Sequence, residues 1–165
     1  MKILDACCGT RMFWLQKHNA DVTYIDIRPE VSPDIVMDCR YTSFPDSTFD
    51  LIFFDPPHRK FGLSSIMAHK YGSILLSEAR SLVRDAFVEF DRILKPGGLV
   101  WFKWSGSEIQ DMAKVQDRFI PLMGQNLNKL RNLKSKGITG SHPAQWLIMA
   151  RNPNVGKQKE LSSRD

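Results

Sequence analysis

The 165-residue sequence contains only three cysteines, Cys7, Cys8 and Cys39, and no two of them have CxxC spacing. So small a set provides neither a disulfide framework nor the spacing of a zinc site, and we expect the thiols to be small packing residues. Long apolar runs are also absent, and no stretch is long enough to cross a bilayer. Residues 1–5 are too few and too soon acidic for a signal peptide. We therefore expect a cytoplasmic protein without a membrane partner.

Acidic residues are missing from two long windows, between Asp55 and Glu78 and between Asp117 and Glu160. The net charge of the chain is +5 at pH 7. The basic residues of the two windows are Arg59, Lys60, Lys70, Arg118, Lys129, Arg131, Lys134, Lys136, Arg151, Lys157 and Lys159. Segregated positive charge suits a polyanionic partner, although charge runs are also common on solvated surfaces. We favour nucleic acid, because the first window begins directly after His58, in a motif described below.

Hydrophobic residues make up 42% of the chain, which is enough for one globular domain with its own core. The sequence shows no internal repeat, linker or second domain. We predict a single domain over residues 1–151, with a basic insertion near residues 124–142 that has no core-facing pattern. Residues 152–165 are polar and are expected to form a flexible tail.

Short apolar runs and segments of helical periodicity alternate along this domain. The runs predict strands at residues 2–6, 22–27, 35–37, 49–54, 99–104 and 146–150. Helices are predicted at residues 12–18, 75–94 and 107–119. The longest is stopped by a Lys-Pro-Gly-Gly sequence at residues 95–98. Because strands alternate with helices, we expect an α/β fold in which a mostly parallel sheet has helices on both faces.

The central element of this pattern is the aromatic run at residues 49–54, which is followed by Asp55, Pro56, Pro57 and His58. A short, mostly apolar run of this kind is typical of a strand buried on both faces. Proline has no N–H to donate to a sheet, so the strand must end near Asp55. A carboxylate, a rigid turn and an imidazole therefore follow a central strand, at the edge where open α/β sheets bind ligands.

Other predicted strands also end at acidic residues. The first leads into a turn of small residues between Asp5 and Gly9, the second ends at Asp26 and the third at Asp38. The turn lacks the GxGxxG spacing of dinucleotide-binding proteins, but small residues let a backbone approach a ligand closely. Asp26 follows about 20 residues later, the spacing at which an acidic side chain accepts hydrogen bonds from a ribose. We expect these carboxylates to form a row along one sheet edge, suited to a positively charged nucleoside.

The order of these features along the chain resembles that of the class I S-adenosylmethionine-dependent methyltransferases. The features are the turn after Asp5, then Asp26, Asp38, the Asp-Pro-Pro-His sequence at residues 55–58 and the Pro-Gly-Gly at residues 96–98. The resemblance covers roughly residues 1–150 and implies a Rossmann-like fold. The Asp-Pro-Pro-His sequence is similar to the motif of enzymes that methylate exocyclic amino groups, chiefly adenine N6 and cytosine N4. Its histidine departs from the commoner tyrosine or phenylalanine.

The resemblance also implies roles for matching positions. Those that would hold the cofactor, S-adenosyl-L-methionine, are Asp5, Ala6, Cys7, Gly9, Asp26, Ile27, Asp38 and Cys39. The first four would line its methionine part, and the last two would meet the adenine edge. Asp26 would accept hydrogen bonds from the ribose, and Ile27 would flank the adenine ring. The target amine would be received by the motif residues Asp55, Pro56, Pro57 and His58. The resemblance implies no metal.

The chemistry of amine methylation explains the motif independently of the family. The lone pair of an aromatic amine is delocalised into its ring, so its nitrogen is a poor nucleophile. The Asp55 carboxylate and the Pro56 carbonyl can each accept one N–H, which pulls the nitrogen toward a tetrahedral shape and frees its lone pair. Proline holds that carbonyl in place in advance. His58 would stack on the base, which must leave its helical stack to reach the site.

These observations favour a methyltransferase acting on a base in DNA or RNA, with adenine N6 as the favoured acceptor. The chain has no room for a separate target-recognition domain, which leaves minimal recognition, an RNA substrate, a partner subunit or a homodimer. Two alternatives remain open: methylation of a small molecule or a protein amide, and a non-catalytic subunit that binds the cofactor. For the tryptophans, we expect Trp101 and Trp146 to be packing residues, and Trp104 either walls the substrate site or fills the core.

Overall fold

The computed structural model describes residues 1–57, 74, 76–105, 118–124 and 144–153. The predictions for His58, for a helix beginning at Ser107, for the basic insertion and for the tail lie wholly or mostly outside these residues. The described strands form one seven-stranded sheet of order β3-β2-β1-β4-β5-β7-β6. Their bounds are β1 Ile3–Asp5, β2 Val22–Asp26, β3 Ile35–Val36, β4 Phe49–Phe54, β5 Leu94–Ser105, β6 Phe119–Gly124 and β7 Ala144–Arg151.

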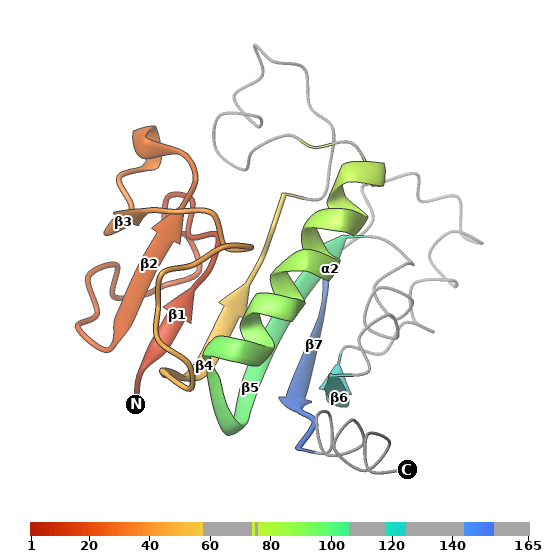
Figure 1. Ribbon diagram of the computed structural model, residues 1–165. Coiled ribbons are helices and arrows are strands. Elements are labelled where there is room, and N and C mark those ends of the chain that lie inside the picture. Colours follow the sequence, from red (N-terminus) through yellow and green to blue (C-terminus); the bar gives the residue numbers. More distant parts are fainter. Residues whose placement is uncertain (58–73, 75, 106–117, 125–143, 154–165) are drawn as a thin grey trace, which may run out of the picture.

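The sheet is mostly parallel. The pairs β1–β2, β1–β4, β2–β3 and β4–β5 are parallel, and β7 runs antiparallel to both β5 and β6. The carboxyl ends of the first five strands therefore meet at one edge, which lies at the top in Figure 1. This arrangement confirms the predicted α/β fold and puts β1 beside β4, where the strand order reverses.

One face of the sheet is covered by helix α2, Leu76–Ile93. Its apolar residues recur at helical spacing, as predicted, and Ala79, Val83, Ala86, Phe87, Phe90 and Ile93 are fully or almost fully buried. On β4, the ring of Phe54 lies 4.9 Å from that of Phe90 and 6.0 Å from that of Phe87. Burial of these aromatic rings makes α2 and β4 the centre of the core.

No α-helix of the described residues covers the opposite face. A smaller cluster of Ile3, Cys8, Val22 and Tyr24 is buried there, with Trp14 and Leu51 packed against it. On β4, Ile52 and Phe54 are fully buried, whereas Leu51 and Phe53 are only half-buried. The sequence predicted a strand buried on both faces, but β4 is fully buried only on the face that α2 covers.

The helix predicted at residues 12–18 is wrong, because the chain there forms a series of turns. The cause is Arg11, which is buried and has a positive φ of 57°. Its guanidinium donates to the carbonyls of Lys17 and Ser32 and to the Asp34 carboxylate, at 2.9, 3.1 and 2.8 Å. The guanidinium also lies 4.1 Å from the centre of the Tyr24 ring. The segment wraps around this cation, and these bonds replace those of a helix.

Two strand predictions also need correction. β5 begins at Leu94, because Leu94 pairs with Phe49 before the predicted stop. A bulge follows, in which β5 advances from Leu94 to Leu99 while β4 advances from Phe49 to Leu51, and Gly97 adopts a φ of 77°. β6 was missed, and Phe119 belongs to it and not to a helix. As an edge strand that contains a proline and buries only Phe119, β6 has no alternating pattern to detect.

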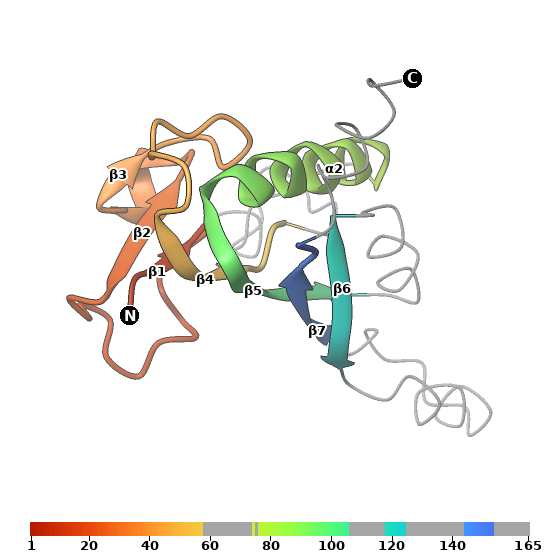
Figure 2. The ribbon, with the colours of Figure 1, turned by 60° about the horizontal axis from the view of Figure 1, so that its bottom comes forward.

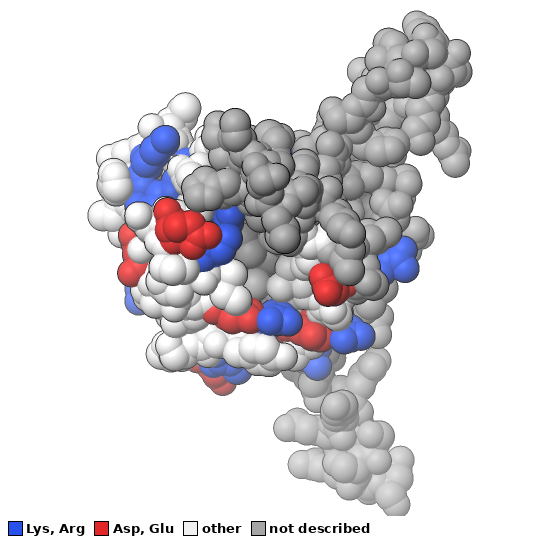
Figure 3. Space-filling model, turned by 90° about the horizontal axis from the view of Figure 1, so that it is seen from above, with Lys and Arg blue, Asp and Glu red and all other residues white. Residues whose placement is uncertain are grey.

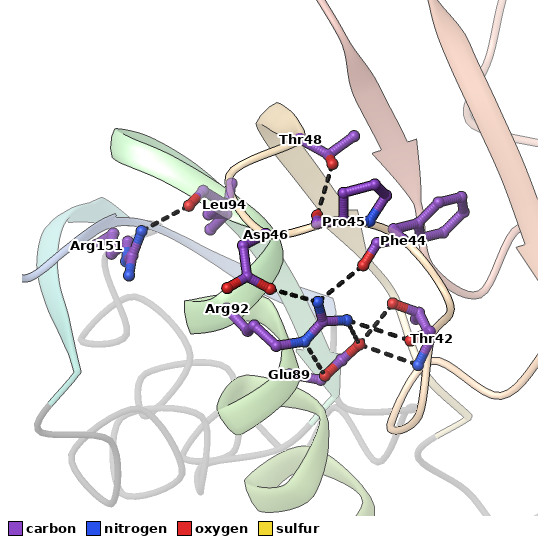
Figure 4. Close-up of polar contacts among 9 residues, drawn as sticks. All are labelled: Thr42, Phe44, Pro45, Asp46, Thr48, Glu89, Arg92, Leu94 and Arg151. Carbon is purple, nitrogen blue, oxygen red and sulfur yellow. Dashed lines mark hydrogen bonds and ion pairs between the residues drawn. The ribbon is translucent and has the colours of Figure 1, made fainter.

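The loop before β4 is clamped to α2 by a charged network (Figure 4). Arg92 donates to the Glu89 carboxylate, to Asp46 and to the Phe44 carbonyl, at 2.5, 2.7 and 2.8 Å. Glu89 also accepts the backbone N–H and the hydroxyl of Thr42, at 3.0 and 2.5 Å. Because this loop leaves the carboxyl end of β3 and enters the amino end of β4, the clamp holds both of these strand ends to α2.

We predict that Glu89→Ala lowers the free energy of unfolding by about 2 kcal/mol, because Thr42 and Arg92 lose an acceptor in a partly buried place. Urea denaturation would measure the change. Arg84→Ala is the control on the same helix, because the Arg84 side chain is exposed and pairs with its neighbour Asp85 at 3.0 Å, and it should change stability by less than about 0.5 kcal/mol. Equal losses for the two variants would contradict a role for the clamp.

Candidate active site at the carboxyl edge

Four aspartates lie where neighbouring strands reach this edge. Asp38 follows β3, Asp26 ends β2, Asp5 ends β1 and Asp55 follows β4, and these strands are adjacent in this order in the sheet. The parallel register thus produces the row of carboxylates that the strand ends suggested. Seen from above, acidic and basic side chains of the described residues lie next to one another on this face (Figure 3).

The turn after β1 is tied to the neighbouring strands through its backbone. The N–H of Gly9 donates to the Asp26 carboxylate at 2.9 Å, and the N–H of Cys8 donates to the carbonyl of Ile25 at 3.0 Å. Gly9 has a φ of 49°, a left-handed conformation that glycine adopts without strain. The N–H of Ala6 donates to the carbonyl of Phe53 at 2.9 Å. The turn is therefore a rigid bridge between β2 and β4.

The two cysteines predicted to meet the cofactor lie together. The sulfur of Cys7 is 4.0 Å from that of Cys39, so the turn also touches the residue after Asp38. The hydrogen bond to Cys39 and burial both raise the pKa of Cys7 well above its ordinary value. Burial raises the pKa of Cys8 to about 12. Both thiols are thus neutral at physiological pH, which fits packing and excludes a thiolate nucleophile.

Asp5 is buried beneath the turn, with 3% of its surface exposed. The indole N–H of Trp14 donates to it at 2.7 Å. Burial, together with smaller contributions from the charges of Asp55 and Asp26, nevertheless raises the pKa of Asp5 from 3.8 to about 7. Asp26 and Asp55 therefore both lie within electrostatic reach of Asp5. Ala6 is also buried, so Asp5 and Ala6 present little surface to a ligand.

Asp26 and Asp38 are each held by the arginine two positions later. Asp26 accepts the backbone N–H of Arg28 at 3.0 Å and its side chain at 3.0 and 3.1 Å. Asp38 is bound by Arg40 in the same way, at 2.6 to 3.1 Å, and the hydrogen bonds from Arg40 lower the pKa of Asp38. Neither arginine was predicted as a site residue, although the repeated Asp-x-Arg spacing is visible in the sequence.

Asp26 has little capacity for a further donor. A carboxylate has about four lone-pair sites, and Gly9 and Arg28 together supply four donors to Asp26. A ribose hydroxyl could bind there only if the Arg28 side chain moves off the carboxylate. The next residue, Ile27, is 63% exposed, which leaves an apolar surface beside Asp26 for a ring to pack on.

The Asp-Pro-Pro motif follows β4 directly. Asp55 and Pro57 are half-buried, and Pro56 is buried. One oxygen of Asp55, Oδ2, accepts a hydrogen bond from the ammonium group of Lys103 on β5 at 2.7 Å. Lys103 was not among the predicted site residues. The signal for it was the parallel register, which places Trp101 beside Phe53 and hence Lys103 beside Asp55.

Aromatic side chains line the sheet face next to this motif. Phe53 and Trp101 stack with centroids 4.1 Å apart, and Trp146 lies 6.5 Å beyond Trp101. Phe13, which is 50% exposed, lies 5.6 Å from Phe53. Trp101 and Trp146 are thus packing residues, as predicted. Trp104 is fully buried in the core on the α2 face, so the core interpretation of Trp104 holds.

The described part of the chain shows no metal site, because no three of its His, Cys, Asp and Glu residues are grouped to hold an ion. No described helix is sufficiently long and apolar to span a bilayer. In the comparisons with known proteins, no family model matches the sequence, and no curated protein does.

Solved structures, in contrast, are similar to this chain. A TehB-like S-adenosylmethionine-dependent methyltransferase from Corynebacterium glutamicum matches with a TM-score of 0.54 and 17% identity, over 92% of this chain and 80% of the other. The 1,6-didemethyltoxoflavin N1-methyltransferase of Burkholderia thailandensis, solved with S-adenosylhomocysteine, matches with a TM-score of 0.55 and 13% identity, over 91% and 70%. The chain therefore has the Rossmann-like fold of class I methyltransferases.

The fold does not determine the reaction by itself. The cyclase SpnF matches with a TM-score of 0.56 and 14% identity, over 91% of this chain and 74% of its own. A protein named for cyclisation thus shares the fold with proteins named for methyl transfer, and the reaction must be argued from the residues at the carboxyl edge.

The raised pKa of Asp5 predicts a pH-dependent cost to stability. In the folded protein the protonated form of the Asp5 carboxyl is favoured. The stabilising effect of this proton is therefore complete below pH 3.8 and is lost as the pH rises to about 7. The difference between these pKa values corresponds to on the order of 4 kcal/mol. We expect Asp5→Asn to be more stable than the wild type at pH 8 and nearly equal to it at pH 4.

Urea denaturation at both pH values would measure this difference. Asp21→Asn is the matched control, because Asp21 is exposed and its replacement removes the same charge. A gain in stability at pH 8 that persists unchanged at pH 4, or one that appears equally in the control, would contradict the assignment.

Proposed function

We propose that this protein transfers a methyl group from S-adenosyl-L-methionine to an exocyclic amino group of a base in nucleic acid, with adenine N6 as the favoured acceptor. The observation that supports this most strongly is the position of Asp55. It follows β4 at the carboxyl edge, next to the turn after β1, and its charge reaches Asp5 in that turn. A hydrogen-bond acceptor for the target amine and the candidate cofactor turn are thus neighbours.

The motif fits the chemistry of an amine that is a weak nucleophile. The Asp55 carboxylate and the Pro56 carbonyl are two acceptors held on a short, proline-stiffened segment. Each accepts one N–H of the target amino group, which directs the nitrogen lone pair away from the ring. Asp55 is also the nearest base for the proton that the nitrogen must lose. Acceptors fixed in advance need no reorganisation during the reaction.

The residues at the turn fit a cationic nucleoside cofactor. When bound, S-adenosyl-L-methionine supplies an electrophilic methyl group on a positively charged sulfur. Asp5 lies beneath the turn, and a cation there would favour the charged form of Asp5, whose pKa is raised to about 7 mainly by burial. Gly9 lets the backbone come close, Asp26 would hold the ribose, and Ile27 would pack against the adenine ring. Cys7, Asp38 and Cys39 would complete the site.

A small-molecule acceptor is the second candidate, and two observations favour it. Arg118 and Arg151 belong to the basic window that suggested a polyanion, yet both bind Asp91 on α2, at 2.5 and 2.8 Å. They hold β6 and β7 to the helix. The described residues also form no extended basic area on the face in Figure 3. A protein amide acceptor and a non-catalytic partner subunit are further alternatives, and the Asp-Pro-Pro motif argues against the latter.

We predict that the protein transfers labelled methyl groups to DNA or RNA when incubated with labelled S-adenosyl-L-methionine and separate pools of DNA, RNA, protein and small metabolites. Asp55→Ala should reduce the rate at least about 100-fold, because a pre-positioned electrostatic contact is lost, while S-adenosylhomocysteine still binds in calorimetry. Label confined to the metabolite pool would support the second candidate. Label in no pool, or an unchanged rate in Asp55→Ala, would overturn the proposal.

We also predict opposite effects on cofactor affinity for the two partners at the end of β2. Asp26→Ala should weaken the binding of S-adenosylhomocysteine about tenfold or more, because the ribose acceptor and the Gly9 bond are lost. Arg28→Met should leave the affinity unchanged or raise it, since this arginine competes with the ribose for Asp26. Isothermal titration calorimetry measures both. Weaker binding in Arg28→Met would assign the ribose contact to Arg28 instead.

A further inference from the structure

The ion pair between Lys103 and Asp55 is nearly removed from water. The exposed fractions of the two side chains are 17% and 13%, and the nitrogen–oxygen distance is 2.7 Å. The same ammonium group lies 4.1 Å from the centre of the Phe13 ring. Taking two charges out of water carries a large desolvation cost. The ammonium group of Lys103, held by Asp55 and by the Phe13 ring, therefore calls for a functional explanation.

The sheet geometry makes this placement unavoidable. Trp101 and Lys103 lie two positions apart on β5, so their side chains share one face, while Phe102 and Trp104 between and beyond them are buried in the core. Phe53 pairs with Trp101 on β4, which brings the next residue of that face, Asp55, to Lys103. Any ligand amine that reaches Asp55 therefore also meets this ammonium group.

We propose that Lys103 is a specificity-determining residue, which limits the site to amino groups that are uncharged at neutral pH and lie beside a hydrogen-bond acceptor. This inference rests on the proposed function. Asp55 and Lys103 together are electrically neutral, so an alkylammonium group would gain little from the carboxylate and would be repelled by the lysine. An uncharged exocyclic amine meets no such opposition.

The hydrogen-bonding capacity of lysine adds the second condition. An ammonium group has three donors and no acceptor, and one donor of Lys103 is used by Asp55. A ligand that satisfies another must offer an acceptor close to its amine. The amino groups of adenine and cytosine lie beside a ring nitrogen with a lone pair, so amine and ring could bind Asp55 and Lys103 together. The side chain of a lysine substrate offers no acceptor.

A positive charge near the attacking nitrogen does not help methyl transfer itself, because that nitrogen becomes positive as it reacts. The contribution of Lys103 therefore lies in binding and selection. This separates it from a structural role, which would reduce turnover and stability together, and it predicts a split between KM and kcat.

The test compares methyl transfer to an adenine-containing single-stranded oligonucleotide with transfer to a lysine-containing peptide. In Lys103→Met, we expect the KM for the oligonucleotide to rise roughly 10- to 100-fold, from the loss of a charge-assisted hydrogen bond, with kcat unchanged or higher. The preference for oligonucleotide over peptide should fall at least about tenfold. Lys103→Arg should retain both properties, because it keeps the charge and the donors.

Lys95→Met is the matched control, since Lys95 forms an ion pair of the same length, 2.7 Å, with Asp50 at the other end of the same two strands. It should leave KM and preference unchanged. Lys103→Gln is a second neutral variant, in case the methionine disturbs folding, and it retains a donor for Asp55. Binding of S-adenosylhomocysteine should be unaffected in every variant.

The outcomes separate the two proposals. A wild type that methylates no base-containing acceptor overturns the proposed function, and this inference with it. A wild type that methylates the oligonucleotide, combined with wild-type KM and preference in Lys103→Met or Lys103→Gln, overturns only the role of Lys103. Equal methylation of the peptide by the wild type also overturns that role.

Discussion

Burial of Asp5 beside other carboxylates is the constraint on which the carboxyl edge depends. Burial disfavours the charged form of Asp5, and the charges of Asp55 and Asp26, which the parallel strands bring near, add to this cost. The neighbouring side chains each offset part of it. Trp14 donates to Asp5, Arg28 neutralises Asp26 and Lys103 neutralises Asp55. These contacts leave the carboxylates of the edge largely paired, and the aromatic core beneath α2 provides the stability that offsets the remaining cost of burying Asp5.

Elements whose pattern reflects burial were predictable from the sequence. The helical spacing of α2, the aromatic run of β4 and the acidic strand ends follow from local rules that hold in almost any α/β protein. Topology then follows from the alternation of elements, which is why the row of carboxylates could be foreseen without coordinates. The positions of these elements require no knowledge of distant contacts.

Features decided by distant contacts could not be predicted in the same way. The apolar spacing after Gly9 suggests a helix, but Arg11 reaches Asp34 and Ser32 and prevents one. β6 exposes nearly all of its side chains, so no pattern marks it. Lys103 appears unremarkable among the basic residues until the register with β4 places it at Asp55. In each case a partner far along the chain overrides the local preference.

The hydrogen bond from Trp14 to Asp5 has a practical consequence. Trp14 lies on the half-buried side of the sheet, with its indole N–H on a carboxyl whose pKa is about 7. A protonated carboxyl quenches indole fluorescence more strongly than a carboxylate does. The part of the protein's emission that comes from Trp14, one of four tryptophans, therefore provides an intrinsic optical readout of the charge beneath the turn, without any label attached to the protein.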